Sequence, residues 1–346
     1  MKIVCDDKIP FIRPALEQLA DEVLFKAGRD IGPEDVRDAD ILVVRTRTRC
    51  DHRLLKDSTV GLVVTATIGF DHIDTRWLEN HGIQWANCPG CNATSVGQYV
   101  LCSLLALQQE RDFRLRDATV GIVGVGHVGT AVVHALESMG VGRLLLCDPP
   151  RQQAGDMAPG GQEWSPLSRL QNEADVISFH TPLTRTGAYA TEHLADEAFF
   201  SALRRQPVII NAARGGVVDE VALLHAMEAN LVREAIVDTW EHEPAPRRAL
   251  LTRAFIATPH IAGYSADGKA NATRMTLAHI CRFMGRSMDF DIVPPPLPAD
   301  FVPPSDPAQL TLQLYDPRTD TRRLRAQPDD FERLRSDYPL RRESCI

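Results

Sequence analysis

The sequence predicts an α/β protein with a doubly wound parallel sheet, a smaller α/β unit and a short C-terminal tail. Apolar, strand-like runs alternate with amphipathic segments through most of the chain, which is typical of parallel strands connected by helices. A glycine-rich stretch at residues 124–129 joins one such run to an amphipathic segment, and a shorter series of runs precedes it. With 346 residues, and at about 150 residues per domain, we expect two domains.

The composition is typical of a soluble globular protein, with 44% hydrophobic residues and no apolar stretch long enough to span a membrane. The net charge of −8 argues against a surface for nucleic acid or anionic lipid, because either would require a basic footprint. The N-terminal stretch MKIVCDDKIP has acidic residues where a signal peptide would continue its apolar run. We therefore expect a cytoplasmic protein with a small-molecule partner, and neither nucleic acid nor membrane.

The first 90 residues predict a small flavodoxin-like α/β unit. Short apolar runs, which we interpret as strands, alternate there with amphipathic segments, which we interpret as helices. The strand-like runs are residues 2–5, 41–46, 61–69 and 83–88, and the helix-like segments are residues 11–20, 51–57 and 74–82.

Cys88 and Cys91, in the stretch NCPGCN, have the C-x-x-C spacing of a redox dithiol or of half a zinc site. A structural zinc ion needs a complete tetrahedral ligand set, and the sequence contains no second pair of this kind. We therefore interpret Pro89 and Gly90 as a turn and expect no metal. The other cysteines should be reduced, buried residues; they are Cys5, Cys50, Cys102, Cys147, Cys281 and Cys345.

A long apolar helix and a second series of strands follow. Residues 93–113 are apolar on nearly every face in the middle of the segment, which predicts a helix buried between domains. A proline-rich linker at residues 290–307 later leads to the C-terminal tail. Between these segments lie six strand-like runs, which predict the doubly wound sheet: residues 118–126, 143–148, 175–180, 207–213, 234–239 and 255–260.

The glycine-rich stretch has the spacing G-x-G-x-x-G, with Gly124, Gly126 and Gly129 between a strand-like run and a helix. This context is typical of Rossmann dinucleotide-binding domains. There the first glycine permits a tight turn, the second admits the pyrophosphate, and the third lets helix and strand pack closely. Asp148 lies 19 residues after Gly129, where a carboxylate would bind the adenosine ribose and repel a 2′-phosphate. We therefore expect NAD, and not NADP, as the cofactor.

Polar side chains follow the other strand-like runs of this series. In open α/β sheets, ligands bind at the carboxyl ends of the strands, so these side chains should gather at one edge. A single histidine at such a place is more often a hydrogen-bonded structural residue than a catalyst, but the whole set predicts a ligand site. Its members are His180, Thr181, Arg214, Asp238, Glu243 and His260.

The motifs resemble those of the NAD-dependent D-2-hydroxyacid dehydrogenases, through PGCNATSVGQY, GIVGVGHVG, HTPLT, NAARGGVVDE, VDTWEHEP and TPHIAGY. Further stretches, among them VRTRT, TATIGFDHID, TPHIAGYSADGK and the tail YDPRTDTRRLR, narrow the resemblance to a branch that acts on a phosphorylated 2-hydroxy acid. The resemblance implies three catalytic residues, Arg214, Glu243 and His260. His260 would accept the hydroxyl proton as hydride leaves C2, Glu243 would hold the imidazole, and Arg214 would bind the substrate carboxylate.

The expected ligand contacts extend this set. Arg45, Arg47 and Arg49 alternate and would share one face if the strand persists; a solvated edge is the other interpretation, and we favour at least Arg45 near a substrate anion. The resemblance adds Thr46, Thr67 and Tyr264 as substrate contacts. The cofactor-binding residues we expect are Gly124, Gly126, His127, Val128, Gly129, Asp148, His180, Thr181, Ala212, Ala213, Arg214, Asp238 and Gly263.

The resemblance also implies a domain organisation and a homodimer. Residues 1–92, completed by a helix at 267–285, would bind the substrate, residues 93–266 would bind NAD, and residues 291–346 would form a linker and a shortened dimerisation segment. The chain departs from the branch in that short tail, which could be a reduced dimer cap or an arm lying on the partner. It also departs at Gln98, where an acidic residue is more usual.

Two other interpretations stay open. A relative that acts on phosphoglycerate, glyoxylate or hydroxypyruvate would share every catalytic residue and differ in the first domain. A non-enzymatic, NAD-sensing adaptor would use the same fold without chemistry. A damaged catalytic set would be the signature of such an adaptor, whereas here Arg214, Glu243 and His260 are all present.

Overall fold

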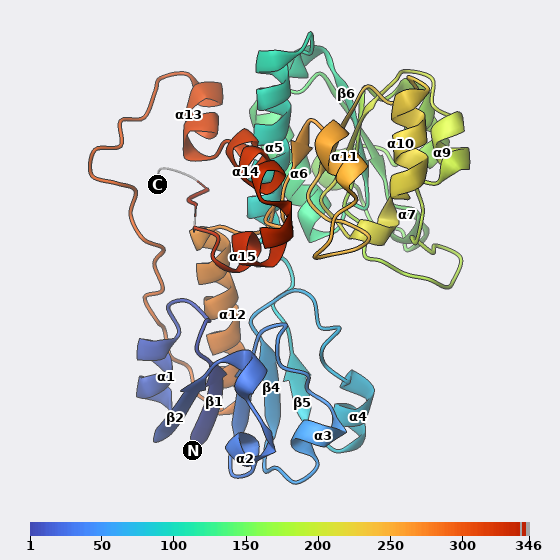
Figure 1. The fold of residues 1–346 in the computed structure, drawn as a ribbon. Helices are drawn as coiled ribbons and strands as arrows, with labels where there is room; N and C mark the ends of the chain where they lie inside the picture. Colours follow the sequence, from blue (N-terminus) through green and yellow to red (C-terminus); the bar gives the residue numbers. More distant parts are fainter. Residues whose placement is uncertain (340, 344–346) are drawn as a thin grey trace. The chain divides into compact units, whose positions relative to one another are not determined.

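The computed structural model describes residues 1–339 and 341–343, so Cys345 lies outside the described residues. The chain divides into two compact units. The first contains Met1–Asn92 and Ser265–Pro296, and the second contains Ala93–Tyr264 and the residues from Leu297 on. Figure 1 shows one parallel sheet in each unit.

The first unit has a five-stranded, fully parallel sheet in the order β2-β1-β3-β4-β5. This is the flavodoxin-like order, so the predicted fold of the unit is confirmed. β2 was not predicted; it is an edge strand without the buried apolar run that marked the others. The strands are β1 (Lys2–Asp6), β2 (Glu22–Lys26), β3 (Ile41–Val44), β4 (Leu62–Thr65) and β5 (Gln84–Ala86).

Helices cover both faces of this sheet because successive strand residues point to opposite sides. Ile3 and Cys5 of β1 face a core shared with α1 and α12, whereas Val4 faces a core shared with α2, α3 and α4. The helices are α1 (Arg13–Leu19), α2 (Pro33–Val36), α3 (His52–Leu55), α4 (Thr75–Asn80) and α12 (Ala266–Phe283), with a 3₁₀ turn η1 (Gly28–Asp30).

The second unit has a six-stranded parallel sheet in the order β11-β10-β9-β8-β6-β7. All six predicted strands are present and the doubly wound fold is confirmed, with a single parallel bridge between Leu146 and Trp164 beyond β7. The strands are β6 (Thr119–Val123), β7 (Arg143–Cys147), β8 (Val176–Phe179), β9 (Val208–Asn211), β10 (Glu234–Val237) and β11 (Ile256–Ala257).

The long apolar helix α5 (Ala93–Glu110) is buried from Ser95 to Leu107, and the covering elements belong to its own unit. One of them is α6, which packs so closely against α5 that a side chain at Gly97 would meet the Ala131 carbonyl. The others are the C-terminal helices. The other helices before residue 297 are α6 (His127–Ser138), α7 (Pro149–Gln153), α8 (Leu167–Glu173), α9 (Glu197–Ser201), α10 (Glu220–Glu228) and α11 (Arg248–Arg253). The 3₁₀ turns are η2 (Leu115–Asp117), η3 (Pro159–Gly161) and η4 (Gly215–Val217).

The C-terminal segment, by which we mean residues 307–339 and 341–343, folds back onto the second unit of its own chain. It contains α13 (Pro307–Leu314), α14 (Pro317–Ala326), η5 (Pro328–Asp330) and α15 (Phe331–Ser336), and α13 and α14 lie against α5 (Figure 1). Leu324 and Phe331 are fully buried in the core of the unit. None of the helices in the described part of the chain has the length and apolar character needed to span a membrane.

Candidate active site

The glycine loop between β6 and α6 forms a cradle at the helix N-terminus. Gly124 has φ +84°, which favours glycine, and a Cβ at Gly129 would lie 2.1 Å from the Gly124 carbonyl oxygen. A Cβ at Gly126, the residue that precedes α6, would meet no atom within 4 Å. The space next to Gly126 is therefore open, as the approach of a pyrophosphate to the backbone requires.

Asp148 follows β7 beside this loop and braces it. Its carboxylate accepts hydrogen bonds from the backbone N–H groups of Val125, at 2.8 Å, and Arg151, at 3.1 Å. A carboxylate has further lone pairs, so these bonds leave acceptors for ribose hydroxyls. The Arg151 guanidinium donates to the Val125 carbonyl, which places a cation next to the acid.

His180 and Thr181, at the end of β8, each have a buried polar atom without a partner among the described residues: Nδ1 of His180 and Oγ1 of Thr181. A Cβ at Gly124 would touch both residues, so they lie directly against the glycine loop. Burial lowers the pKa of His180 to about 3, which keeps the ring neutral. Unpartnered buried groups beside an open cradle fit a bound dinucleotide.

Arg214 lies on a tight loop after β9, held by a residue that sequence analysis missed. The Asn211 side chain donates to the Arg214 carbonyl at 3.1 Å and accepts from the Ala213 N–H at 3.2 Å. A Cβ at Gly215 would lie 2.0 Å from the Trp240 carbonyl oxygen, so only glycine permits this approach. The guanidinium is exposed and donates to the Ala213 carbonyl at 2.8 Å, with no carboxylate partner among the described residues.

His260 and Glu243 form a close pair. The histidine Nδ1 lies 2.9 Å from Oε2 and 3.0 Å from Oε1 of Glu243, and the Trp240 backbone N–H donates to Oε1 at 3.0 Å. Burial alone would raise the pKa of Glu243, but the hydrogen bond and charge of His260 hold it below its usual value. With Nδ1 engaged by a carboxylate, Nε2 is the ring nitrogen left to exchange a proton with a substrate.

The backbone at His260 is unusual, because φ is 57°, in the left-handed region that non-glycine residues rarely adopt. Such a conformation persists only where neighbouring groups fix it. The His260 N–H donates to the Asp238 carbonyl at 2.8 Å, and the Ile261 and Ala262 N–H groups donate to the Asp238 carboxylate at 2.8 and 2.9 Å. Asp238, expected as a cofactor contact, therefore also holds the loop; its burial raises its pKa. Gly263 and Tyr264 complete the loop.

The predicted substrate residues of the first unit lie around the end of β3 and β4. The strand ends at Val44 and a turn follows, so the condition for a common face of Arg45, Arg47 and Arg49, a strand that continues, is not met. Arg45 binds the buried Asp6 carboxylate at 3.1 and 3.3 Å.

The side chains of Thr46 and Thr67 differ in exposure and in contacts. Thr46 is exposed, and the Thr67 hydroxyl donates to the Gly69 carbonyl at 2.9 Å.

The C-x-x-C pair is a pair of buried thiols within the first unit. Cys88 Sγ lies 3.4 Å from the Ala272 carbonyl and from the Thr276 hydroxyl. Burial raises the pKa of Cys88 to about 11 and that of Cys91 to about 12, which makes both poor nucleophiles. Within the described ranges, no group of histidine, cysteine and acidic residues could hold a metal ion.

Comparisons with known proteins match this chain to one family of dehydrogenases. The family model described as "D-isomer specific 2-hydroxyacid dehydrogenase, NAD binding domain" matches residues 102–262. Over 99% of its length the chain is 48% identical to the erythronate-4-phosphate dehydrogenase of Bacteroides thetaiotaomicron, covering 97% of that protein. Over 99% of its length it is also 42% identical to the protein of that name from Porphyromonas gingivalis, covering 94% of it.

Solved structures support the fold. The D-mandelate dehydrogenase of Rhodotorula graminis has a TM-score of 0.68 at 20% identity, and the alignment covers 85% of this chain and 99% of that one. The D-lactate dehydrogenase of Aquifex aeolicus, solved with NAD and lactic acid, has a TM-score of 0.62 at 22% identity, over 82% and 96% of the two chains.

Proposed function

Because the chain belongs to the family of D-isomer specific 2-hydroxyacid dehydrogenases, we propose that it oxidises 4-phospho-D-erythronate with NAD. The product would be 2-oxo-3-hydroxy-4-phosphobutanoate, in the biosynthesis of pyridoxal 5′-phosphate. The observation that carries the proposal is the 48% identity to an erythronate-4-phosphate dehydrogenase over 99% of the chain, which takes in the first unit and the C-terminal segment.

The side chains supply the acid–base chemistry that such an oxidation needs. NAD supplies the hydride acceptor when it is bound. His260 accepts the C2 hydroxyl proton through Nε2, and Glu243, on Nδ1, keeps that tautomer and stabilises the imidazolium. Arg214 has no carboxylate partner in the described part of the chain, so its guanidinium is available for the substrate carboxylate and the C2 oxygen.

We also propose which residues of each unit bind the substrate and which bind NAD. The residues that we propose as substrate contacts are Arg45, Thr46 and Thr67, which belong to the first unit, and Tyr264, which belongs to the second. The Asp6 carboxylate holds the Arg45 guanidinium in place, and the donors that it leaves over would serve a substrate anion. The second unit binds NAD through the glycine loop, Asp148, the ends of β8 and β9, Asp238 and Gly263.

We also propose a cytoplasmic homodimer. The free, buried cysteines of the described residues support a reducing compartment, and the resemblance supports the dimer. Light scattering on the purified protein tests the assembly: a mass of about twice 38.3 kDa is expected, and a monomer at micromolar concentration contradicts the dimer.

A substrate panel tests the reaction. Initial rates of NADH formation are measured with 4-phospho-D-erythronate, D-erythronate, 3-phospho-D-glycerate and D-glycerate. We expect kcat/KM for 4-phospho-D-erythronate to exceed that for D-erythronate by roughly 10²- to 10⁴-fold, from two charge-assisted hydrogen bonds of about 1.5–3 kcal/mol each.

Each other outcome has a definite meaning. A preference for 3-phospho-D-glycerate would place the chain among relatives with another substrate. NAD binding without turnover of any acid would support the adaptor interpretation.

A further inference from the structure

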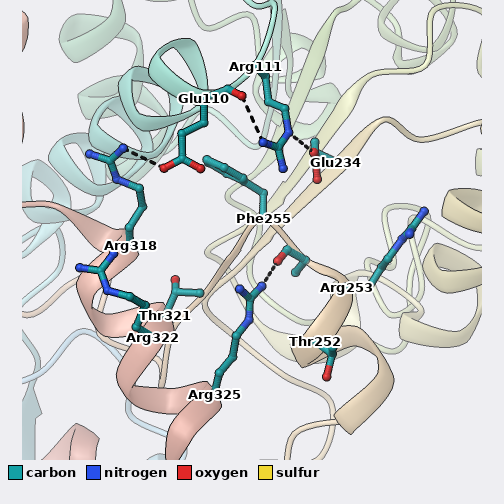
Figure 2. Close-up of a pocket in the computed structure, with 11 residues that line it drawn as sticks. Glu110, Arg111, Glu234, Thr252, Arg253, Phe255, Arg318, Thr321, Arg322 and Arg325 are labelled. Carbon is teal, nitrogen blue, oxygen red and sulfur yellow. Dashed lines mark hydrogen bonds and ion pairs between the residues drawn. The ribbon is translucent and has the colours of Figure 1, made fainter.

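The C-terminal segment is fastened to the second unit by arginines of α14. Figure 2 shows the seam, a cavity of about 320 Å³ lined by residues of α5, β10, α11 and α14. Arg318 forms an ion pair with Glu110 at 3.0 Å, and Arg325 donates to the carbonyls of Leu251 and Ala254. Because Arg318 and Arg325 serve these contacts, we interpret the cavity as a seam between elements and not as a ligand site.

The same helix contacts the strand that leads to His260. The backbone N–H of Ala257, in β11, donates to the Thr321 hydroxyl of α14 at 3.1 Å. Leu324, one helical turn further on, is fully buried beside the sheet. The C-terminal segment is thus bound to β11, the strand that leads to His260, the proposed base.

Arg341 binds the loop that follows His260 by donating hydrogen bonds to the backbone carbonyl groups of that loop. The guanidinium donates to the carbonyls of Ile261, at 3.1 Å, Ala262, at 2.6 Å, and Tyr264, at 2.8 Å. The Asp238 carboxylate already binds N–H groups of the same loop. The left-handed turn is therefore held by an anion on its N–H groups and a cation on its carbonyls.

Arg335, in α15, approaches the other member of the pair. Its Nη1 lies 3.6 Å from Oε2 of Glu243, and its side chain is 23% exposed. Its other neighbours are Tyr264 and the Glu332 carboxylate, which lies 4.0 Å from Nη1. The charged and polar groups that face the Glu243 carboxylate are thus His260, the Trp240 N–H and Arg335.

We propose that Arg335 and Arg341 are positioning residues of the active site. Arg341 fixes the backbone that presents His260, and Arg335 fixes the carboxylate that orients the imidazole. Both lie beyond residue 262, where the matched NAD-binding domain ends, so the C-terminal segment supplies a part of the catalytic centre. The inference rests on the proposed function, because it assigns roles relative to the proposed pair of His260 and Glu243.

Four full-length variants test the proposal. Arg335→Met removes the charge at similar length, Arg335→Lys restores a charge, and Arg341→Met removes the carbonyl clamp. Arg322→Met is the matched control, because Arg322 is an exposed arginine of α14 whose side chain contacts Thr319 of its own helix. For each variant we would measure kcat and KM across pH, the Kd of NADH by fluorescence, and the melting temperature.

We expect Arg335→Met and Arg341→Met to lose roughly 10- to 100-fold in kcat, the effect of a misplaced catalytic group, with little change in the Kd of NADH. Arg335→Lys should recover most of the loss, and Arg322→Met should match the parent protein. In Arg335→Met the acidic limb of the kcat/KM profile should move to higher pH. The reason is that removing a nearby positive charge stabilises the imidazolium.

A normal kcat and an unshifted pH profile in Arg335→Met would overturn the proposal. An activity loss that follows a lowered melting temperature, with the acidic limb unshifted, would assign both arginines to folding alone and overturn it as well. Failure of the proposed function is a separate result, because it would appear in the parent protein as a lack of NADH formation from 4-phospho-D-erythronate.

Discussion

Replacing Glu243 with glutamine removes one charge from the proposed catalytic pair while keeping the shape of the side chain. Two unit charges about 4 Å apart interact by about 4 kcal/mol at an effective dielectric constant near 20. The side chains of His260 and Glu243 are 26% and 20% exposed, and Arg335 offsets part of the carboxylate charge. We therefore discount the interaction to about 1–2 kcal/mol.

The imidazolium loses this stabilisation in Glu243→Gln, so the base protonates only at lower pH. At about 1.36 kcal/mol per pH unit, the acidic limb of kcat/KM should move down by about 1 unit. kcat should fall as well, because an amide no longer fixes the tautomer with the proton on Nδ1. The direction of the shift is opposite to that expected for Arg335→Met.

Steady-state kinetics of Glu243→Gln, His260→Ala and the double variant, with melting curves as controls, measure these effects. His260→Ala should lose about 10²- to 10⁴-fold in kcat. The double variant should lose far less than the product of the single losses, because the two residues act as a unit. Near-normal kcat in His260→Ala, or losses that multiply, would refute this reasoning.

Three further predictions concern the cofactor site and pH. Gly129→Ala places a Cβ 2.1 Å from the Gly124 carbonyl oxygen, so NADH binding by fluorescence titration should be lost, and retained affinity would contradict the cradle. Asp148→Ser removes the negative charge but leaves Arg151, so the ratio of kcat/KM for NADP over NAD should rise; an unchanged ratio would contradict the role of Asp148. The pKa of His180 is about 3 in the folded protein and 6.5 in the unfolded chain, so the folded protein binds fewer protons at this residue. The free energy of unfolding should therefore fall as the pH drops below about 6.5. In His180→Gln, urea titrations should show a weaker pH dependence; an unaltered one would contradict the shift.

The sequence allowed the second sheet and its glycine loop to be predicted because both leave local signals. A strand buried on both faces is a continuous apolar run, and G-x-G-x-x-G directly after such a run marks the turn into the helix. β2 lacks this signal because it is an edge strand with only partly buried side chains. The common face for Arg45 and its neighbours failed for a related reason: the alternation continues past Val44, but the strand does not.

Individual hydrogen bonds left no such signal, whether the residues are near or far apart in sequence. The Asn211 side chain and the Trp240 N–H hold the proposed catalytic loops through bonds that no sequence pattern indicates. Gln98 was noted only as a departure from related sequences. In the structure its amide accepts from Arg341 at 3.0 Å and donates to the Arg342 carbonyl at 2.9 Å, which a carboxylate could not do because it has no donor.

The hydrogen bond from the Ala257 N–H to the Thr321 hydroxyl affects the tendency of the protein to aggregate. β11 is the last strand of its sheet, and an uncovered edge offers free N–H and carbonyl groups to which a strand from another molecule can add. In this chain α14 lies against that edge, and its Thr321 hydroxyl accepts a hydrogen bond from the Ala257 N–H. Release of the helix would therefore expose an edge to which strands of other molecules could add, so the segment that holds the catalytic loop also covers a site of strand addition.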